Sequence, residues 1–231
     1  MLIILAARQD KTAWWLADRW EGHEAVVVSA TDLSTSGWNL DFPSNGRSIS
    51  NIARRKVMNQ EIDGVLTRMA RVYSHELDHI VPTDRQYVAS EMTAFLLAWL
   101  SSLKCPILNP PTPDCLCGPG WRTEEWVQFA GRLGMSVSTV RRKSSGGGEN
   151  SEIQSLCEVT VIGDKCFGSA APRLIENAHT LAKAAGTSFL AVRFTGSEAD
   201  AAFVNASPWP RLDSPEVADA TLCCLRGRLA C

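Results

Sequence analysis

Short apolar runs alternate with helical patterns along the first half of the chain. Leu2–Ala6 is continuously apolar, and a helix pattern opened by Asp10 follows it. Ala25–Ser29 and Gly64–Arg68 are two more runs of strand length, and Arg85–Leu103 repeats apolar residues at helical spacing. Because helical segments separate the strands, the pattern predicts an α/β domain with an open parallel sheet, Rossmann-like in outline.

The second half has a different pattern, with a hairpin at its start. In "EVTVIGDKCFG", residues 158–168, apolar residues alternate with small or polar ones, and Gly163-Asp164 is typical of a tight turn. A helix, two strands and a last helix are expected after it, at Pro172–Gly186, Phe189–Phe194, Ala201–Asn205 and from Ser214 onward. This order predicts a small α+β lobe.

Glycine-rich and polar stretches divide the chain into three parts. Residues 1–120 are expected to form the Rossmann-like domain. Residues 121–152 contain a helix that begins at Thr123 and the stretch "KSSGGGENSE", so we expect a linker helix and a Gly/Ser-rich linker there. Residues 153–231 then form the α+β lobe.

Composition and charge narrow the class of protein. A 231-residue chain with a net charge of −2 and 45% hydrophobic residues is typical of a globular protein without an overall attraction to nucleic acid. The apolar start is too short for a signal peptide or a membrane span, so we expect a cytoplasmic protein without nucleic-acid or membrane partners. The eight cysteines are then expected to be free thiols, with a metal site drawn from Cys105, Cys115 and Cys117 as the alternative.

The stretch "HELDH" matches a zinc-binding pattern. On a helix, His75 and His79 would share one face and bind zinc, and Glu76 would act as a general base. The form H-E-x-D-H is similar to that of peptide deformylases, which need a cysteine ligand upstream, yet no cysteine precedes Cys105. Pro82 also ends any helix soon after the motif. A surface loop or a pH-sensitive contact is therefore the competing interpretation.

Eight segments, taken in order, carry a resemblance to a known family. They are "LIILAARQDKTAWWLADRW", "DLSTSGWNL", "GVLTR", "YVASEMTAFLLAWLSSLKCPILNPP", "WRTEEWVQFAGRLGM", "VTVIGDKCFG", "LAKAAGTSFLAVRF" and "FVNASPWPRL". The chain resembles the ATP-grasp superfamily, in the branch of ribosomal-protein glutamate ligases and peptide-maturing ligases. The resemblance implies a Rossmann-like pre-ATP-grasp domain with a parallel sheet, followed by a reduced C-terminal ATP-grasp-like lobe.

Members of that superfamily activate a carboxylate as an acyl phosphate with Mg-ATP and couple it to an amine. Their nucleotide lies between a central lobe and the C-terminal lobe. Between Gly134 and the hairpin, where the family has its central lobe, this chain has only "MSVSTVRRKSSGGGENSEIQSLC". The resemblance is therefore to a truncated member that lacks the central lobe.

The nucleotide-binding positions of the C-terminal lobe also depart from the family. Glu158 stands where the family motif R-V-T-V-x-G-D has its arginine, and Arg193 stands at an acidic position. Of the family's Glu-x-Asn metal motif, this chain keeps Asn205. Phosphates would meet an anion and magnesium would meet a cation, so the resemblance implies a degenerate nucleotide site. Glu158 and Arg193 are expected to pair with each other across the sheet.

Four other residues are candidates for binding a substrate or partner. The resemblance places Arg68, Glu91 and Asn109 at or near the substrate cleft of the family's first domain. Arg68 ends a parallel strand and Asn109 follows another, and open α/β sheets bind ligands at the carboxyl ends of their strands. Trp15 lies in a tryptophan-rich first helix that cannot bury all its rings, so it is a candidate interface anchor. The alternative is that Glu91 is an exposed helix residue, that Asn109 is a turn residue before the prolines, and that a neighbouring loop covers the ring of Trp15.

These features predict a non-catalytic ATP-grasp-like protein, a pseudoenzyme that binds a peptide or partner enzyme in a peptide or natural-product modification pathway. No cofactor is expected, and the chain could be a homodimer or a subunit of a heteromer. One alternative is an ATP-dependent carboxylate–amine ligase that uses Mg-ATP and is completed by a partner chain. The other is a zinc metalloprotein that uses His75 and His79.

Overall fold

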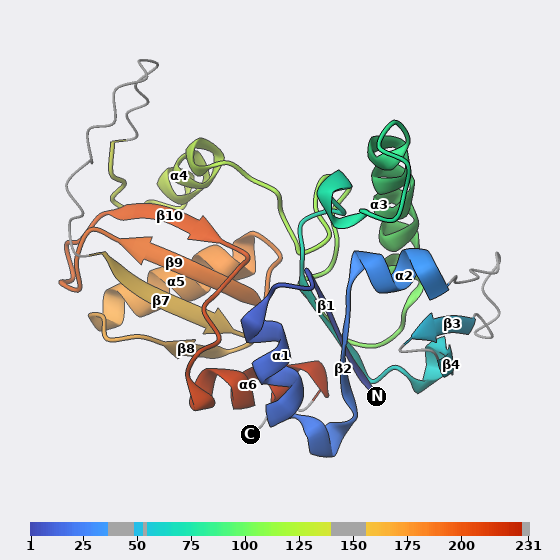
Figure 1. Cartoon of the computed structure of the whole chain (residues 1–231). Helices are drawn as coiled ribbons and strands as arrows, with labels where there is room; N and C mark the ends of the chain where they lie inside the picture. The colour runs from blue at the N-terminus through green and yellow to red at the C-terminus, as the bar shows by residue number, and fades with distance from the viewer. Residues whose placement is uncertain (37–48, 53–54, 140–155, 228–231) are drawn as a thin grey trace. The chain divides into compact units, whose positions relative to one another are not determined.

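The computed structural model describes most of the chain, namely residues 1–36, 49–52, 55–139 and 156–227 (Figure 1). Contacts divide the chain into two compact units. The first unit holds residues 1–120 and 212–231, and the second holds residues 121–211. The predicted Gly/Ser-rich linker falls largely within 140–155, outside the described residues.

A four-stranded parallel sheet forms the centre of the first unit. Its strands are β1 (Leu2–Ala6), β2 (Ala25–Val28), β5 (Gly64–Arg68) and β6 (Ile107–Leu108), in the order β2-β1-β5-β6. The pairings of β1 with β2, β1 with β5 and β5 with β6 are all parallel. The parallel sheet predicted from the alternation of strands and helices is therefore confirmed.

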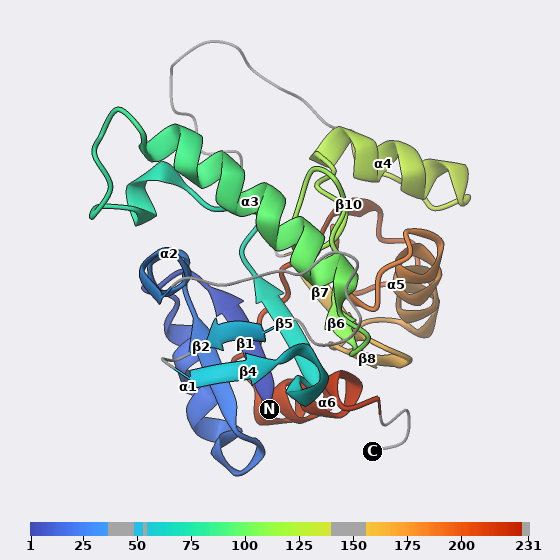
Figure 2. The same cartoon turned by 90° about the vertical axis from the view of Figure 1, so that its right-hand side faces the viewer.

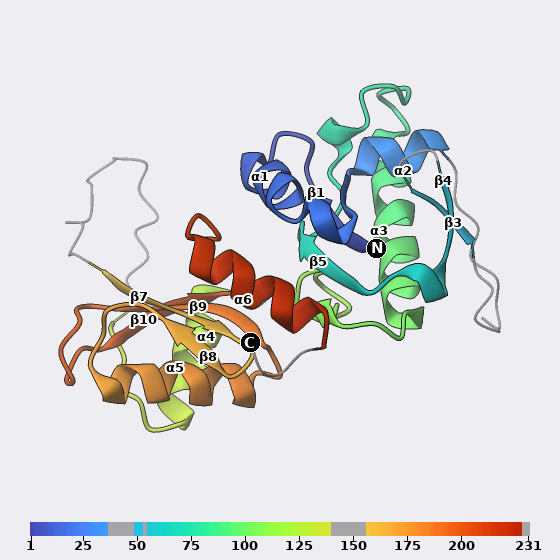
Figure 3. The same ribbon diagram turned by 90° about the horizontal axis from the view of Figure 1, so that it is seen from below.

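Helices cover both faces of this sheet. α1 (Lys11–Arg19) and α6 (Pro215–Leu225) lie on one side of the strands, and α3 (Arg85–Ser102) lies on the other (Figure 3). α2 (Ala30–Ser36) comes directly after β2. An antiparallel hairpin follows in the chain, formed by β3 (Ile49–Ile52) and β4 (Arg55–Met58).

α3 lies along one side of the first unit's sheet (Figure 2) and supplies much of the core on that side. Strand residues Ile3, Leu5 and Val65 belong to the same buried cluster as one face of this helix. The buried residues of that face are Met92, Leu96, Trp99 and Leu100. Because burial of a large apolar side chain is worth about 1.5–3 kcal/mol, packing alone accounts for the helical spacing of these residues.

The last helix, α6, belongs to the first unit. An ideal Cβ on Gly64 would lie 2.5 Å from the carbonyl oxygen of Leu225, so the backbones of β5 and α6 approach closely at this glycine. Arg19 of α1 also pairs with Asp219 of α6 at 2.8 Å. The division expected from sequence placed residues 153–231 together, and the structure differs because α6 packs beside β5.

The second unit contains an antiparallel sheet in the order β10-β9-β7-β8. Its elements are α4 (Thr123–Arg132), β7 (Cys157–Ile162), β8 (Lys165–Phe167), α5 (Pro172–Ala184), β9 (Phe189–Phe194) and β10 (Phe203–Ser207). β7 and β8 form the predicted hairpin, and Gly163 has a φ of +57° in its turn. A left-handed backbone favours glycine there, which explains the turn chemistry seen in the sequence.

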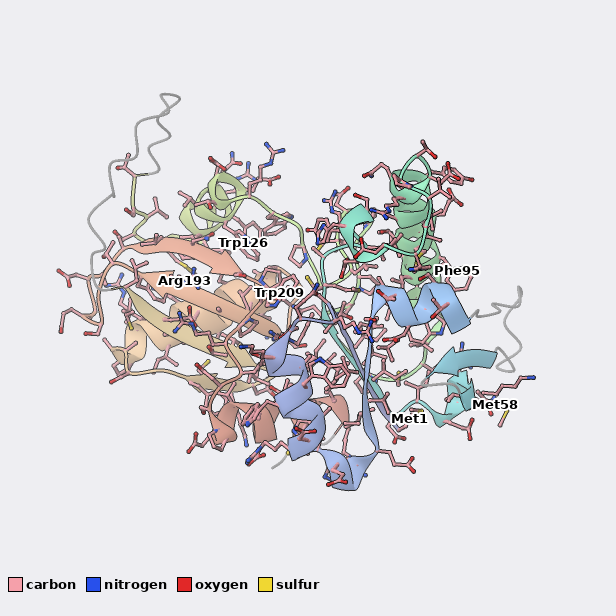
Figure 4. All side chains as sticks on the ribbon, viewed as in Figure 1. Met1, Met58, Phe95, Trp126, Arg193 and Trp209 are labelled. Atoms are coloured by element: carbon pink, nitrogen blue, oxygen red, sulfur yellow. The ribbon has the colours of Figure 1, made fainter. Side chains whose placement is uncertain are left out.

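α4 is part of the second unit's core. Trp126 and Ala130 on this helix are fully buried, and they cluster with Val159, Val192 and Phe203 of the sheet. Figure 4 labels Trp126 next to this helix. The sequence predicted a linker helix here, and that prediction is wrong because α4 places its apolar face against the strands.

Three short 3₁₀ helices complete the described secondary structure, at Glu21–His23, Asn59–Glu61 and Ser74–Glu76. Within the described part of the chain, no helix has the length and apolar character needed to cross a membrane. Among the described residues, Cys105, Cys115, Cys117, Cys157 and Cys166 are free thiols, whereas Cys223 on α6 is disulfide-bonded. The disulfide at Cys223 differs from the expectation that all eight cysteines are free thiols.

Candidate functional site

Glu158 and Arg193 form an ion pair across the second sheet. The two residues face each other in the register of β7 and β9, and Nε of Arg193 lies 2.8 Å from Oε2 of Glu158. Figure 4 labels Arg193 on this sheet. Their side chains are partly exposed, so the pair contributes about 0.2–1 kcal/mol to stability. Its main consequence is chemical, because each charge is neutralised by the other.

Asn205 stands beside this ion pair on the third strand. Its position on β10 is paired with Arg193 on β9, so the three residues are cross-strand neighbours in the order Asn205, Arg193, Glu158. Oδ1 of Asn205 accepts a hydrogen bond from the backbone N–H of Ala206 at 2.8 Å. The three residues of the predicted degenerate nucleotide site are thus brought together by strand register.

The ion pair lies on the sheet face away from the apolar core. Val159 and Val192 come next to Glu158 and Arg193 in their strands, and both are buried with residues of α4 and α5. Since successive side chains point to opposite faces of a strand, Glu158 and Arg193 lie on the other face. The patch is made of one anion, one cation and one amide, and its formal charges cancel.

The first unit has a second candidate site, at the carboxyl edge of its parallel sheet. The chain passes from β1 to β2 on one side and then to β5 on the other, so the order of strands reverses between β1 and β5. Open α/β sheets bind ligands outside the carboxyl ends of the strands at such a point. Arg68 is the last residue of β5 and lies at this position.

Arg68 is buried and paired with Asp10. Its Nε lies 2.7 Å from Oδ2 of Asp10, and its Nη2 lies 3.3 Å from Oδ1. The side chain of Arg68 is only 8% exposed. Its Nη1 is among the buried side-chain atoms of the described residues that have no hydrogen-bond partner. A buried guanidinium N–H without a partner is costly, and it is suited to donate to an oxygen of a ligand.

Sequence reasoning identified Asp10 only as the N-cap of the first helix. The structure confirms that role, because Oδ1 of Asp10 accepts a hydrogen bond from the backbone N–H of Ala13 at 3.1 Å. The same carboxylate also neutralises Arg68. The sequence position of Asp10, soon after a buried parallel strand, could have indicated this second role, because polar residues converge at the carboxyl edge of such a sheet.

Asn109 lies at the same edge as Arg68, whereas Glu91 does not join them. Leu66 of β5 is paired with Leu108 of β6, so Asn109 comes directly after the strand that borders β5. Its side chain is 1% exposed, and its Nδ2 donates to the carbonyl of Cys117 at 3.4 Å. Glu91 lies on α3 with an exposed side chain.

The HELDH stretch is not on an α-helix. His75 and Glu76 are in a 3₁₀ helix, and His79 follows it in a turn. Oε2 of Glu76 accepts from the backbone N–H of Tyr73 at 2.9 Å, and Nε2 of His79 lies 2.9 Å from Oγ of Ser34. The helical geometry on which the zinc hypothesis rests is therefore missing. In the described part of the chain, no group of three or more His, Cys, Asp or Glu side chains is placed to hold a metal.

The same stretch borders a small polar cavity of about 230 Å³ in the first unit. Its lining consists of polar and charged side chains from the ends of β1 and β2 and from the HELDH stretch. The residues are Arg8, Gln9, Ser29, Thr31, His75, Glu76, Asp78 and His79. Arg8 and Gln9 of this lining come directly before Asp10 in the loop after β1.

Trp15 is exposed, as expected from the sequence. Its side chain on α1 is 37% exposed, and the guanidinium carbon of Arg19 lies 5.8 Å from the centroid of its ring. Trp14 is also exposed, and its Nε1 donates to the carbonyl of Arg8 at 3.0 Å. The role of Trp15 as an interface anchor stays a prediction.

Solved structures similar in fold to this chain include a macrocyclase and ATP-grasp ligases that were determined with precursor peptides. Macrocyclase MdnC bound with precursor peptide MdnA, from Microcystis aeruginosa MRC, has a TM-score of 0.72 at 14% identity, covering 98% of this chain and 99% of that chain. The ATP-grasp ligase PsnB, complexed with a phosphomimetic variant of minimal precursor, Mg and ADP, gives 0.69 at 11%, covering 96% and 98%. A Chryseobacterium gregarium RiPP-associated ATP-grasp ligase, in complex with ADP and a leader and core peptide, gives 0.67 at 9%, covering 99% and 97%.

The comparisons establish the fold of this chain and nothing more specific. No protein-family model matches it. No curated protein matches it either. The mixed α/β architecture is that of an ATP-grasp ligase, which agrees with the resemblance drawn from the sequence.

Proposed function

We propose that this chain is a non-catalytic ATP-grasp-like protein that binds a peptide, or a partner enzyme, in a peptide-modification pathway. Its fold supports the pathway, because the solved structures that resemble it are peptide-modifying ATP-grasp ligases, and several of them hold precursor peptides. The proposal separates two properties of those proteins. The chain keeps the ability to bind a peptide and has lost the ability to bind Mg-ATP.

The Glu158–Arg193 ion pair is the observation that carries the non-catalytic part of this proposal. In the family that the chain resembles, an arginine at the first position faces phosphate and an acid at the second holds magnesium. Here Glu158 would repel phosphate and Arg193 would repel magnesium, while each satisfies the other at 2.8 Å. Asn205 supplies one neutral oxygen, whereas magnesium in phosphate sites is bound through carboxylates.

The length of the connection between α4 and β7 supports the same proposal. α4 ends at Arg132 and β7 begins at Cys157. The intervening residues are far fewer than the roughly 50 that even a small domain needs. In the family that the chain resembles, the central lobe lies at this place in the sequence, so a connection this short supports the proposal that this chain has no second wall for a nucleotide site.

Arg68 is the residue that we propose to contact the peptide. It lies at the strand-order reversal of the parallel sheet, and its Nη1 is buried without a partner. Because Asp10 already neutralises the guanidinium, this N–H favours a neutral acceptor such as a backbone carbonyl over a free carboxylate. Asn109 would border the same ligand, and Trp15 would anchor a partner protein on α1.

A thermal melt with and without millimolar Mg-ATP tests the loss of nucleotide binding. Ligand at a hundred times its dissociation constant adds about 2.7 kcal/mol of stability, which is a shift of several degrees for a chain of this size. We expect no shift beyond that of magnesium chloride alone at equal ionic strength. A clear additional shift would overturn the proposal and favour the ligase completed by a partner chain.

Selection from a random peptide library on the immobilised protein tests the peptide-binding part. We expect enriched sequences that bind the wild type at least tenfold more tightly than Arg68→Met. Asp200→Asn, at an exposed position of the second unit, serves as a control that leaves the sheet edge intact. Failure to enrich any sequence, or equal binding by Arg68→Met, would contradict the assignment.

A further inference from the structure

Cys115 and Cys117 lie side by side in a turn that follows β6. Their Sγ atoms are 3.4 Å apart, and both side chains are buried, with exposures of 6% and 1%. The backbones of Thr112 and Cys115 exchange two hydrogen bonds, of 2.8 and 3.1 Å. Oγ1 of Thr112 donates to the carbonyl of Gly118 at 2.9 Å. The turn is therefore fixed on both sides of the cysteine pair.

We propose that Cys115 and Cys117 form a dithiol modification site that a small-molecule disulfide, such as oxidised glutathione, converts into an intramolecular disulfide. The proposal concerns a site that the peptide-binding function does not use. It also differs from the metal alternative considered for the sequence, because that alternative required Cys105 as a third ligand.

The distance between the two sulfurs favours closure of a bond. A disulfide has an S–S length of about 2.05 Å, so the sulfurs need to approach by little more than 1 Å. The turn already holds the two residues together, and the entropy cost of closing so short a loop is small. A tetrahedral zinc ion would need two further ligands, which are not placed around this pair in the described part of the chain.

The charges around the pair assign different roles to the two sulfurs. The hydrogen bond between the two sulfurs, in which either atom can donate, holds the pKa of Cys115 below its usual value, and the positive charge of Arg71 acts in the same direction. Burial and Asp114 oppose this effect. The same hydrogen bond and burial raise the pKa of Cys117, and the charge of Arg68 opposes them. Cys115 is also the more exposed of the two residues, at 6% against 1%, so we assign Cys115 as the attacking thiolate and Cys117 as the resolving thiol.

The reaction balances as two thiol–disulfide exchanges. The Cys115 thiolate attacks one sulfur of oxidised glutathione, forms a mixed disulfide and releases one glutathione thiolate. Cys117 then loses its proton and attacks the Cys115 sulfur, which releases the second glutathione. The protein loses two hydrogen atoms, and the two electrons reduce the glutathione disulfide.

Other free thiols of the described residues are poorer nucleophiles. Burial raises the pKa of Cys105 to about 11, and it also raises the pKa values of Cys157 and Cys166. At neutral pH these three are almost entirely protonated, so exchange with glutathione is slow. The pKa directions therefore favour Cys115 over these three thiols.

Peptide mapping of the native, full-length protein tests the proposal. After incubation with oxidised glutathione, free thiols are blocked with iodoacetamide in denaturant, and the protein is digested with trypsin. Cleavage after Lys104 and Arg122 gives one peptide that contains Cys105, Cys115 and Cys117. We expect this peptide to change from three blocked thiols to one, with a mass lower by two hydrogens than that of the linear form. Cys105→Ser should give two and then none.

Single variants separate the two roles. Cys117→Ser should trap a glutathione adduct on Cys115, because the resolving thiol is absent, and Cys115→Ser should leave Cys117 unmodified. Thermal melts confirm that both variants are folded. Three blocked thiols in the oxidised wild type, or a persistent glutathione adduct instead of a closed disulfide, would overturn the proposal even if a variant failed to fold.

Discussion

Arg68 at the end of β5 and Asp10 in the loop after β1 form a buried ion pair, and the same carboxylate of Asp10 caps α1. One side chain thus joins two neighbouring strands of the sheet and sets the start of a helix. The pair lies where the strand order reverses, so the residue that we propose to contact a ligand is held in place by the framework of the fold.

Asp10→Asn isolates the electrostatic part of this arrangement. Asparagine is as good an N-cap as aspartate, so α1 keeps its cap, but Arg68 becomes a buried charge without a counter-ion. Breaking a buried pair in this way lowers the free energy of unfolding by about 3–5 kcal/mol. The amide oxygen of asparagine can still accept a hydrogen bond from Arg68, so we expect a loss at the lower end of this range, about 3 kcal/mol. Guanidinium unfolding measures it. Asp18→Asn, at an exposed position of α1, should change stability by less than about 0.5 kcal/mol, and equal effects of the two would contradict the ion-pair assignment.

The close approach of α6 to β5 gives a second prediction. A Cβ at Gly64 would lie 2.5 Å from the Leu225 carbonyl, which belongs to the backbone and cannot rotate away. Gly64→Ala should therefore displace α6 and cost about 1–3 kcal/mol in the free energy of unfolding. Gly22→Ala is the matched control, because nothing lies within 4 Å of its Cβ. Similar stability of the two variants would show that α6 does not dock at this glycine.

Much of the fold was visible in the sequence because its signals are local. The apolar runs of β1 and β5, the helical spacing in α3 and the Gly163 turn each depend on neighbouring residues, and all four were predicted correctly. The positions of α4 and α6 were not, since an apolar helix face does not specify which sheet will cover it. Trp126 and Leu225 found their partners through long-range packing that periodicity cannot encode.

The sites show the same division between local and long-range information. The pairing of Glu158 with Arg193 followed from the charges expected at two aligned strands. The motif letters of HELDH suggested a helix, but the chain forms a 3₁₀ turn in which Glu76 caps the backbone of Tyr73. The contact between Cys115 and Cys117 depends on a turn closed by Thr112, which spacing alone does not reveal.

The low pKa of Cys115 predicts the pH dependence of its alkylation. A lowered pKa means that the thiolate persists at pH values below the usual cysteine range and is lost as the pH falls through the lowered pKa. Alkylation by iodoacetamide in the native protein should therefore rise to half its maximum at a pH clearly below the pKa of about 8.5 of an unperturbed cysteine. Mass spectrometry of the tryptic peptide reports it. Arg71→Met should move the midpoint upward, whereas a midpoint near 8.5 in the wild type would contradict the thiolate assignment.

The Glu158–Arg193 pair predicts that exchanging its charges will be tolerated, whereas changing one of them will not. In Glu158→Arg, two arginines face each other across β7 and β9, and like charges at directly opposed positions are destabilising by about 0.2–1 kcal/mol relative to a neutral pair. Loss of the original attraction adds a similar amount. The double variant Glu158→Arg, Arg193→Glu restores opposite charges in the same register, so its free energy of unfolding should return to within about 0.5 kcal/mol of the wild type. Urea denaturation of the two single variants and the double variant gives the coupling energy, and additive effects would mean that the two side chains do not interact.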